Sequence, residues 1–336
     1  MKNAYLNYAA KRFVQAVVVI LLAYVLTFVV VSILPGDPIT NVLRNPQNGF
    51  TEDEIKEIIA AQGLDKPVLV QLSTSLSNFL TGDLGLSMRT NRPVTTLIGE
   101  VLPSTLVLAL TGLVVALLLA AAIAYGTQFL PKRFGQGLLR GFPSLFLSVP
   151  NFVIGLVLIH VFGFQLGLFR VIEANSFWAT LFASIALGIP ISAQIAEVLI
   201  ANLDHESGQE YAAVARSRGL GQMRLFAKHL LKPSSLPVIT VIALTIGELL
   251  GGSLITEAVF GRTGVGSLVQ RSVSTQDLPV LQAVVSLAAV VFVLVNLIAD
   301  LAYPLLDPRV KLIGVPERRP ATADDSSAGI SQEVTS

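Results

Sequence analysis

Long uncharged stretches dominate the order of apolar and polar residues along this chain. Six of them reach the length of about 20 residues that an α-helix needs to cross the hydrocarbon core of a bilayer. They are Phe13–Leu34, Ser104–Leu130, Phe142–Phe169, Phe177–Ala196, Leu236–Thr256 and Leu278–Ala299. In hydrocarbon every backbone N–H and C=O group needs a partner within its own segment, so such stretches form helices. The pattern predicts an all-α polytopic membrane protein with six transmembrane helices.

Four of the six stretches carry additional features. The third contains Pro143 and Pro150, so we expect only part of it to span the membrane. The fifth carries the only charge within the six, Glu248, and the fourth ends just before Glu197, which we place at the inner membrane surface. The first follows a basic start, but its 22 residues exceed a typical signal-peptide core and no A-x-A site follows. We therefore predict an uncleaved first span.

Lysine and arginine are distributed unequally over the segments that connect the spans. If the N-terminus lies inside the cell, the inner segments hold 15 of these 23 residues. The long outer segment 35–103 holds five more, and long translocated segments follow the positive-inside rule poorly. The short outer loops hold only three. The rule therefore predicts that both chain ends face the cytoplasm (N-in, C-in).

The overall composition supports a membrane protein and excludes several kinds of site. Hydrophobic residues make up 53% of the 336 and charged residues 13%, about half the share typical of soluble domains. A formal net charge of +1 gives no reason to expect a nucleic-acid partner. The chain has no cysteine, which excludes disulfides, thiolate metal sites and a cysteine nucleophile. No spacing typical of metal ligands or of a nucleophile–base pair occurs, so we predict no catalytic, metal or cofactor-binding residue.

The remaining segments predict a division into four regions. These are residues 1–34 with the first span, an extracytoplasmic lobe at 35–93, a membrane core at 94–304 with the other five spans, and a cytoplasmic tail at 305–336. Within the lobe, Thr51 is followed three residues later by Glu54, a capping-box spacing that predicts a short acidic helix. The tail from about residue 316 is rich in Pro, Ser, Ala and Asp, so we expect it to be disordered.

The inner segment 202–235, between the fourth and fifth spans, is basic and resembles folded protein more than a linker. Ala212, Ala213 and Ala215 give a small-residue surface that allows close approach of another element. Gly219 and Gly221 then permit a sharp turn that ends the first helix. A second basic helix over Gln222–Leu231 is expected next, stopped by the prolines at 233 and 237. The pattern predicts a helix–turn–helix elbow beneath the membrane. The later cations of this segment, Arg224, Lys228 and Lys232, could instead serve to anchor it to anionic lipid.

This segment resembles the cytoplasmic coupling loop of ABC-importer permeases, in the branch that serves peptides, nickel and related cargo. The shared features are an acidic–aromatic pair, an A-R-x-[KR]-G-L run, a basic–His pair and a closing L-P. Here they are Glu210-Tyr211, residues 215–220, Lys228-His229 and Leu236-Pro237. The resemblance extends to "LPGDP", "GDLGLSMRTNRPVTTLI", "GGSLITEAVFGRTGVGSL" and "NLIADLAYPLLDPRVK", in the same order around the same topology. Against the general pattern E-A-A-x-x-x-G aligned on Gly219, Ala213 replaces the glutamate.

The resemblance implies a type I importer permease whose elbow docks on an ATPase subunit. The residues that it assigns to this coupling are Glu210, Tyr211, Ala212, Ala215, Arg216, Gly219 and Leu220. The chain contains no G-x-x-x-x-G-K-[ST] loop, so ATP is expected on partner subunits only. The resemblance further implies a second homologous permease chain forming a heterodimer, an extracytoplasmic binding protein that docks on the outer lobe, and a multi-pass location in the bacterial cytoplasmic membrane.

The cargo implied by the resemblance is di- or oligopeptides, with nickel chelates, glutathione-like compounds or oligosaccharides as alternatives. An ion-coupled secondary transporter is the competing class, but such proteins usually have repeated halves and several mid-membrane acids. Only Glu248 lies well inside a span, where it is a candidate either for lining the translocation path or for helix packing. We expect Glu257 and Asp300, near opposite membrane surfaces, to be interfacial residues or partners between helices.

Overall fold

The computed structural model describes residues 2–33, 51–61, 66–131 and 135–306, which are almost entirely helical. Five described helices are long and apolar enough to cross a membrane, and a sixth span is formed by two helices that meet at 102°. The predicted all-α architecture with six spans is confirmed, and so is the interruption of the third. The spans are α1 (Lys2–Ile33), α5 (Val94–Phe129), the bent pair α6 (Gln136–Ser148) and α7 (Asn151–Leu158), α8 (Phe177–Ser207), α11 (Leu231–Val259) and α13 (Leu278–Leu306). The last part of the bent span is η3 (Ile159–Gln165), a π-helical turn.

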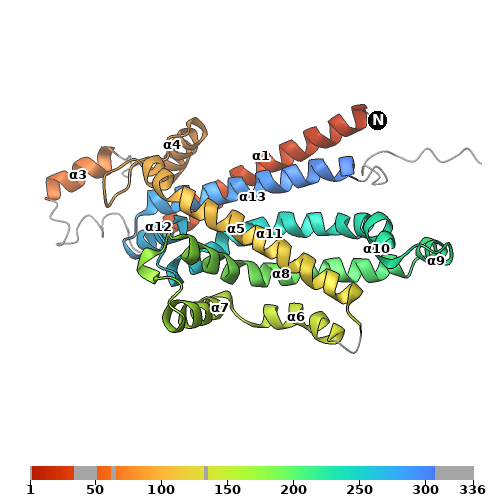
Figure 1. Cartoon of the computed structure of the whole chain (residues 1–336). Coiled ribbons are helices and arrows are strands. Elements are labelled where there is room, and N and C mark those ends of the chain that lie inside the picture. Colours follow the sequence, from red (N-terminus) through yellow and green to blue (C-terminus); the bar gives the residue numbers. More distant parts are fainter. Residues whose placement is uncertain (1, 34–50, 62–65, 132–134, 307–336) are drawn as a thin grey trace, which may run out of the picture.

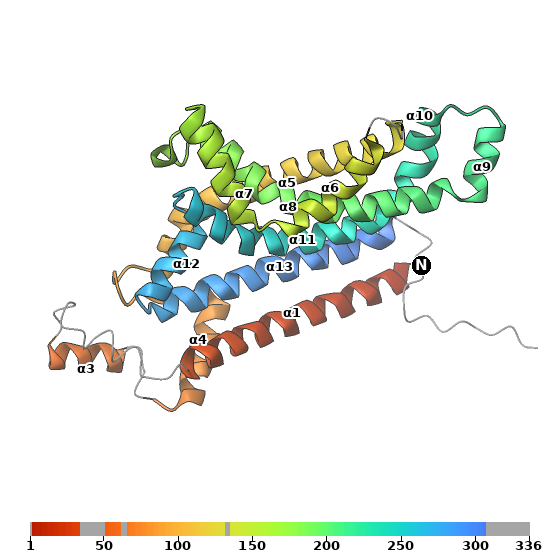
Figure 2. The same ribbon diagram turned by 90° about the horizontal axis from the view of Figure 1, so that it is seen from below.

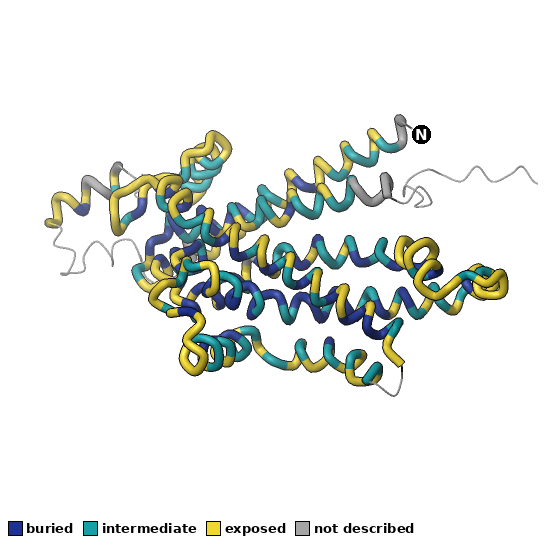
Figure 3. The backbone as a smooth tube through the Cα atoms, viewed as in Figure 1, coloured by how far each residue is buried: buried dark blue, intermediate teal, exposed yellow. Residues whose placement is uncertain are grey.

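Helix α8 lies at the centre of the bundle and packs against α5, α11, α6 and α7. It is the most buried of the spans, as Figure 3 shows. The pair α1 and α13 lies on one side of this centre and the pair α6 and α7 on the other (Figures 1 and 2). The large side chains that remain exposed on the outer helices, such as Leu22 and Leu118, are apolar and suit contact with lipid.

Small residues explain how closely α5 and α8 approach each other. Gly112, Ala116 and Ala120 follow one another at every fourth position of α5, and all three are buried. On α8, a Cβ atom added to Gly188 would lie 2.9 Å from the carbonyl oxygen of Gly112 and 3.2 Å from the backbone nitrogen of Ala116. Without large side chains between them, helix backbones in a membrane gain close van der Waals packing. The core is therefore built around a direct contact between two backbones.

The first and last spans are joined near the chain ends. Arg12 forms an ion pair with Asp300 at 3.0 Å, and the hydroxyl of Tyr5 donates to the carbonyl of Leu301 at 3.1 Å. The prediction that Asp300 is a partner between helices is confirmed. The N-terminus, the end of α13 and the inner segment between α8 and α11 all lie at the same end of the bundle (Figure 1). This arrangement agrees with both ends lying on the cytoplasmic side.

The outer lobe contains two described helices, α3 (Glu52–Ala61) and α4 (Val68–Thr81). The predicted capping box at the start of α3 is confirmed, because the backbone N–H of Thr51 donates to Glu54 Oε2 at 2.7 Å. Helix α4 was not predicted. It packs on α1 through Tyr24, whose hydroxyl lies 2.5 Å from Ser75 Oγ and whose ring centroid lies 4.4 Å from that of Phe79. Residues 34–50 and 62–65 of the lobe and the predicted disordered tail lie outside the described residues.

Two helices differ in extent from what the sequence suggested. Helix α8 continues past the apolar stretch and Glu197 to Ser207. The prolines at 233 and 237 do not separate the elbow from the fifth span, because both lie within α11. Helices α10, η5 and α11 follow one another without a break, so Pro233 lies inside a continuous helix. Pro237 is tolerated deeper in the helix, as prolines in membrane spans often are.

Candidate functional site

The predicted elbow is present and projects from the end of the bundle that carries both termini (Figures 1 and 2). It consists of α9 (Glu210–Ser217), α10 (Gln222–Leu225) and η5 (Phe226–Leu230). The second helix is therefore shorter than expected and widens into a π-helical turn that leads directly into α11. This continuity attaches the elbow to the fifth span without a flexible linker.

Gly219 makes the turn of the elbow possible. Its φ angle is +80°, a left-handed conformation that residues with a Cβ atom rarely adopt. The N–H of Gly219 donates to the carbonyl of Arg216 at 2.9 Å, and the N–H of Leu220 donates to that of Ala215 at 3.1 Å. These two bonds form a Schellman motif, which satisfies carbonyls at the end of a helix. Gly221 has an ordinary φ of −64°, so the turn requires only the first of the two glycines.

The small residues of α9 face inward. Ala212 is fully buried, and Ala215 and Leu220 are half-buried against the same core cluster, which also contains Leu225 and Leu230. The small-residue surface expected at Ala212 and Ala215 therefore faces other elements of this chain. Helix α9 has eight residues, and Ala212 and Ala215 lie on the face that is turned toward the bundle. Their side chains hold the elbow together, whereas Ala213 is exposed.

The outer face of α9 is polar and carries Glu210, Tyr211 and Arg216, all exposed. The phenol of Tyr211 donates to Glu206 Oε2 at 2.5 Å. Partial burial, and then this bond to a carboxylate, raise the pKa of Tyr211 to about 12. The phenol is therefore neutral at physiological pH and acts as a donor. Arg216 donates to the carbonyl of Ser207 at 3.1 Å and ties α9 to the end of α8.

A cavity of about 270 Å³ lies between the elbow and the end of α5. Its walls combine polar groups with apolar and aromatic side chains from α5, the end of α8 and the elbow. They are Gln128, Phe129, Ser207, Arg216, Leu220, Gln222, Leu225, Phe226 and Leu230. The elbow is thus not packed solidly against the bundle at its root.

Glu248 lies on α11 and is exposed in the isolated chain. Its carboxylate accepts a hydrogen bond from Gln194 of α8 at 2.9 Å. One turn further along α8, Glu197 is also exposed and accepts from Ser144 of α6 at 3.3 Å. Both acids therefore have uncharged partners, and no ion pair within the described residues neutralises either of them.

Glu257 joins two helices at the outer end of the bundle. Its carboxylate is fully buried and accepts from the hydroxyl of Thr105 on α5 at 2.6 Å and from the N–H of Gly266 at 2.8 Å. Gly266 belongs to α12 (Val265–Ser274), a short outer helix that was not predicted. A Cβ atom at Gly264 or Gly266 would overlap the carboxylate. A G-x-G motif shortly after an acidic residue was therefore the sequence signal that could have indicated this contact. The prediction that Glu257 is a partner between helices is confirmed.

The polar side chains Glu210, Tyr211 and Arg216 of the elbow are exposed. In the described part of the chain, no three His, Cys, Asp or Glu side chains gather in a way that could hold a metal ion. The elbow offers a turn, a neutral phenol and exposed cations beyond the ends of two long helices.

Comparison with known proteins identifies the class. Residues 112–312 match the family described as binding-protein-dependent transport system inner membrane component, and residues 5–109 match its N-terminal counterpart. The chain belongs to this family. It is a multi-pass permease subunit of an ABC importer in the bacterial inner membrane, and it is not itself an enzyme. ATP hydrolysis and cargo capture belong to a separate ATPase and a binding protein.

The chain is also similar to individual transport proteins and to one solved structure. The chain is 33% identical over 307 residues to the glutathione transport system permease protein GsiC of Escherichia coli O6:H1. The alignment covers 91% of this chain and 99% of that protein. It is 32% identical over the same length to GsiC of Shigella boydii serotype 4. The fold is similar to that of a chain in inward-facing MetNI, a methionine ABC transporter, with a TM-score of 0.53 and 15% identity. That match covers 62% of this chain and 96% of the other, and it supports the type I importer fold.

Proposed function

We propose that the elbow is the site where the ATPase subunit docks, and that it transmits the closure of the ATPase to α8 and α11. Glu210, Tyr211 and Arg216 supply the outer contacts, while Gly219 fixes the angle between α9 and α10. Ala212, Ala215 and Leu220 contribute as inner packing that keeps the elbow stiff. Support comes from its position at the cytoplasmic end, its continuity with α11 and its hydrogen bond to the end of α8.

The cargo that we infer is a short peptide carrying a free amino group, with glutathione as one member of this class. The observation that carries this inference is the identity of 33% over 99% of a glutathione permease. A similarity over the whole length includes every helix that could line the path. Nickel chelates and oligosaccharides are the less supported cargoes, because the relatives' names point to a peptide.

The exposed acids on α8 and α11 agree with such a cargo. Glu197 and Glu248 lie on a face of the central helices that this chain leaves open. A carboxylate facing lipid is costly, so such residues usually face water or a protein. We infer that the path lies along this face and that Glu248 interacts with the ammonium group of the peptide. A neutral oligosaccharide could donate hydroxyl hydrogen bonds to this carboxylate but would form no ion pair with it.

The same open face supports a second permease chain. Glu197 and Glu248 would remain against lipid if this chain acted alone, so a partner is needed to enclose the path. We infer a related but distinct chain, which makes the assembly a heterodimer with one elbow for each ATPase subunit. We assign the lobe 35–93 to the binding protein, and its described helices α3 and α4 lie at the end opposite the elbow.

The test is uptake by the complete transporter in proteoliposomes. We expect ATP-dependent uptake of labelled glutathione or tripeptides, weak uptake of N-acetylated peptides and none of maltotriose. Glu248→Gln should reduce the preference for the free amino group while leaving ATP hydrolysis intact. Gln194→Glu is the matched variant, since it adds a second carboxylate beside Glu248 and should not weaken that preference.

Two results would contradict the proposal. Uptake driven by an ion gradient without any ATPase would identify a secondary transporter. Equal uptake of free and N-acetylated peptides by both the wild type and Glu248→Gln would remove Glu248 from the path.

A further inference from the structure

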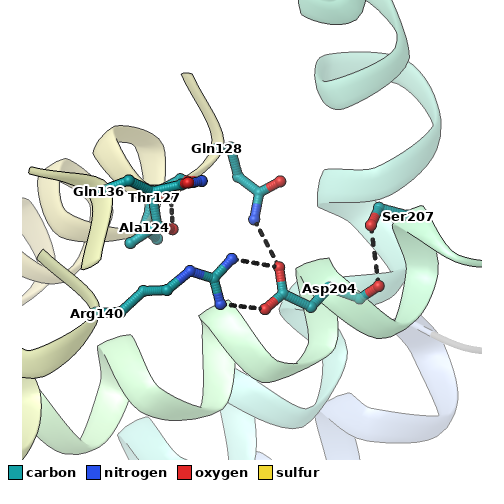
Figure 4. Close-up of polar contacts among 7 residues, drawn as sticks. All are labelled: Ala124, Thr127, Gln128, Gln136, Arg140, Asp204 and Ser207. Atoms are coloured by element: carbon teal, nitrogen blue, oxygen red, sulfur yellow. Dashed lines mark hydrogen bonds and ion pairs between the residues drawn. The ribbon is translucent and has the colours of Figure 1, made fainter. Parts of the chain in front are cut away.

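The inner ends of three spans meet at one carboxylate. Asp204, on the last turn of α8, accepts hydrogen bonds from Arg140 of α6 at 2.6 and 3.0 Å and from Gln128 of α5 at 3.1 Å (Figure 4). The guanidinium binds the carboxylate through two parallel bonds, which fix both the distance and the relative orientation of the side chains. Asp204 therefore joins three helices at a point directly before the elbow.

The elbow reaches the same point through two more contacts. Arg216 of α9 donates to the carbonyl of Ser207, whose hydroxyl donates to the carbonyl of Asp204 at 2.9 Å. Gln222 of α10 donates to the main-chain carbonyl of Gln128 at 2.8 Å. The cavity of about 270 Å³ lies between these contacts. Directional hydrogen bonds thus join the root of the elbow to α5 and α8 around this space.

Helix α6 is the element that this cluster holds. It has 13 residues and buries only one of them. Gln136, Arg140 and Ser144 are four residues apart, so they share one face of the helix. All three hydrogen-bond to α5 or α8. Beyond Ser148 the chain turns through 102° into α7, so a rotation of α6 would move the outer half of the third span.

We propose that Arg140 and Asp204 are positioning residues that couple the elbow to α6. When the elbow moves the end of α8, the ion pair makes α6 move with it and so turns the broken third span. This inference rests on the proposed function of the elbow. The two side chains are 41% and 40% exposed, and a half-exposed ion pair contributes little to overall stability. Its loss should therefore change the coupling and leave the fold intact.

The test uses the complete transporter with Arg140→Gln, with Asp204→Asn, and with the exchange of Arg140→Asp and Asp204→Arg together. In proteoliposomes we expect each single variant to hydrolyse ATP at close to the wild-type rate. The ATP consumed per peptide imported should rise at least about fivefold, the lower end of typical coupling effects. The exchange should restore most of the coupling. Arg170→Gln is the matched control, because it breaks an exposed pair with Glu173 at the outer end and should change nothing.

A distance measurement distinguishes coupling from a merely structural role. The chain has no cysteine, so spin labels can be placed at Leu138→Cys on α6 and Met223→Cys on α10, which are 67% and 55% exposed. We expect the distance between the labels to be the same with and without ATP in the otherwise wild-type chain. With Arg140→Gln it should differ between the two states. If that variant does not assemble, Arg140→Lys keeps the charge, loses the paired bonds and should show the same change more weakly.

The outcomes separate this inference from the proposed function. Unchanged coupling and unchanged label distances in the single variants overturn the role of the pair, and so does an exchange that restores nothing. If a variant of the elbow itself, Gly219→Ala, uncouples the transporter while Arg140→Gln does not, only the pair is refuted. If neither variant uncouples it, the proposed function of the elbow is refuted as well.

Discussion

The turn at Gly219 allows a prediction that depends on backbone conformation alone. A Cβ atom added here would meet no other atom within 4 Å, so a substitution creates no clash. The φ of +80° is nevertheless unfavourable for any residue with a Cβ atom. Holding alanine in this left-handed conformation costs about 1–2 kcal/mol. Gly219→Ala therefore changes the shape of the elbow without changing its chemistry.

The magnitude follows from the competition between the present turn and other turns. A penalty of about 1–2 kcal/mol lowers the population of the present turn about 5- to 30-fold relative to its alternatives. Asparagine tolerates left-handed backbone better, so we expect Gly219→Asn to lie between the wild type and Gly219→Ala. Gly219→Val should be the most severe because a β-branched side chain is the least compatible with this conformation.

The assay is the amount of ATP hydrolysed per peptide imported in proteoliposomes, together with hydrogen exchange over residues 210–231. We expect the ratio and the exchange rate to rise in the order Gly, Asn, Ala, Val at position 219. Gly221→Ala is the matched control, two residues away, with an ordinary φ of −64° and open space around it. Equal behaviour of the alanine variants at 219 and 221 would refute the assignment of the turn to Gly219.

Two further predictions concern packing and ionisation. Gly188→Ala would place a Cβ atom 2.9 Å from the carbonyl of Gly112, so we expect overpacking to destabilise the transporter by about 1–3 kcal/mol in thermal unfolding. Gly141→Ala, with open space around it, is its control, and equal melting temperatures would contradict the close contact. The pKa of Tyr211 is raised to about 12, so its neutral form is favoured in the folded state and any resulting stability is lost as the pH rises from about 10 towards 12. The ultraviolet titration of the wild type minus Tyr211→Phe should show one phenol ionising near pH 12, and a difference centred near 10 would disprove the shift.

Features that depend on the membrane or on near neighbours could be predicted from the sequence. The apolar spans follow from the thickness of the bilayer, and the elbow follows from glycine and alanine positions a few residues apart. The capping box at Thr51 and Glu54 involves groups only three residues apart. Each of these depends on a short stretch of chain, which a single sequence displays directly.

Features that depend on distant partners could not be predicted. Helix α4 docks through Tyr24 and Ser75, which are 51 residues apart, and α12 is held by Glu257, whose partner Thr105 is 152 residues away. The pair Arg140 and Asp204 is separated by 64 residues. The inward orientation of Ala212 was missed for a related reason. A run of alanines shows that the side chains of a helix are small, but it does not show whether they face the bundle or the solvent.

The backbone contact between Gly112 and Gly188 has a mechanical consequence. No flexible side chain separates the two helices there, so α5 and α8 can tilt together but cannot easily slide along each other. With 31 residues, α8 is about 46 Å long at a rise of 1.5 Å per residue. A tilt of the joined pair by about 5° would shift one end sideways by about 4 Å relative to the other, at the same rise. A small rotation at the cytoplasmic surface would thus be enough to widen an opening at the far side of the membrane by more than the diameter of a water molecule.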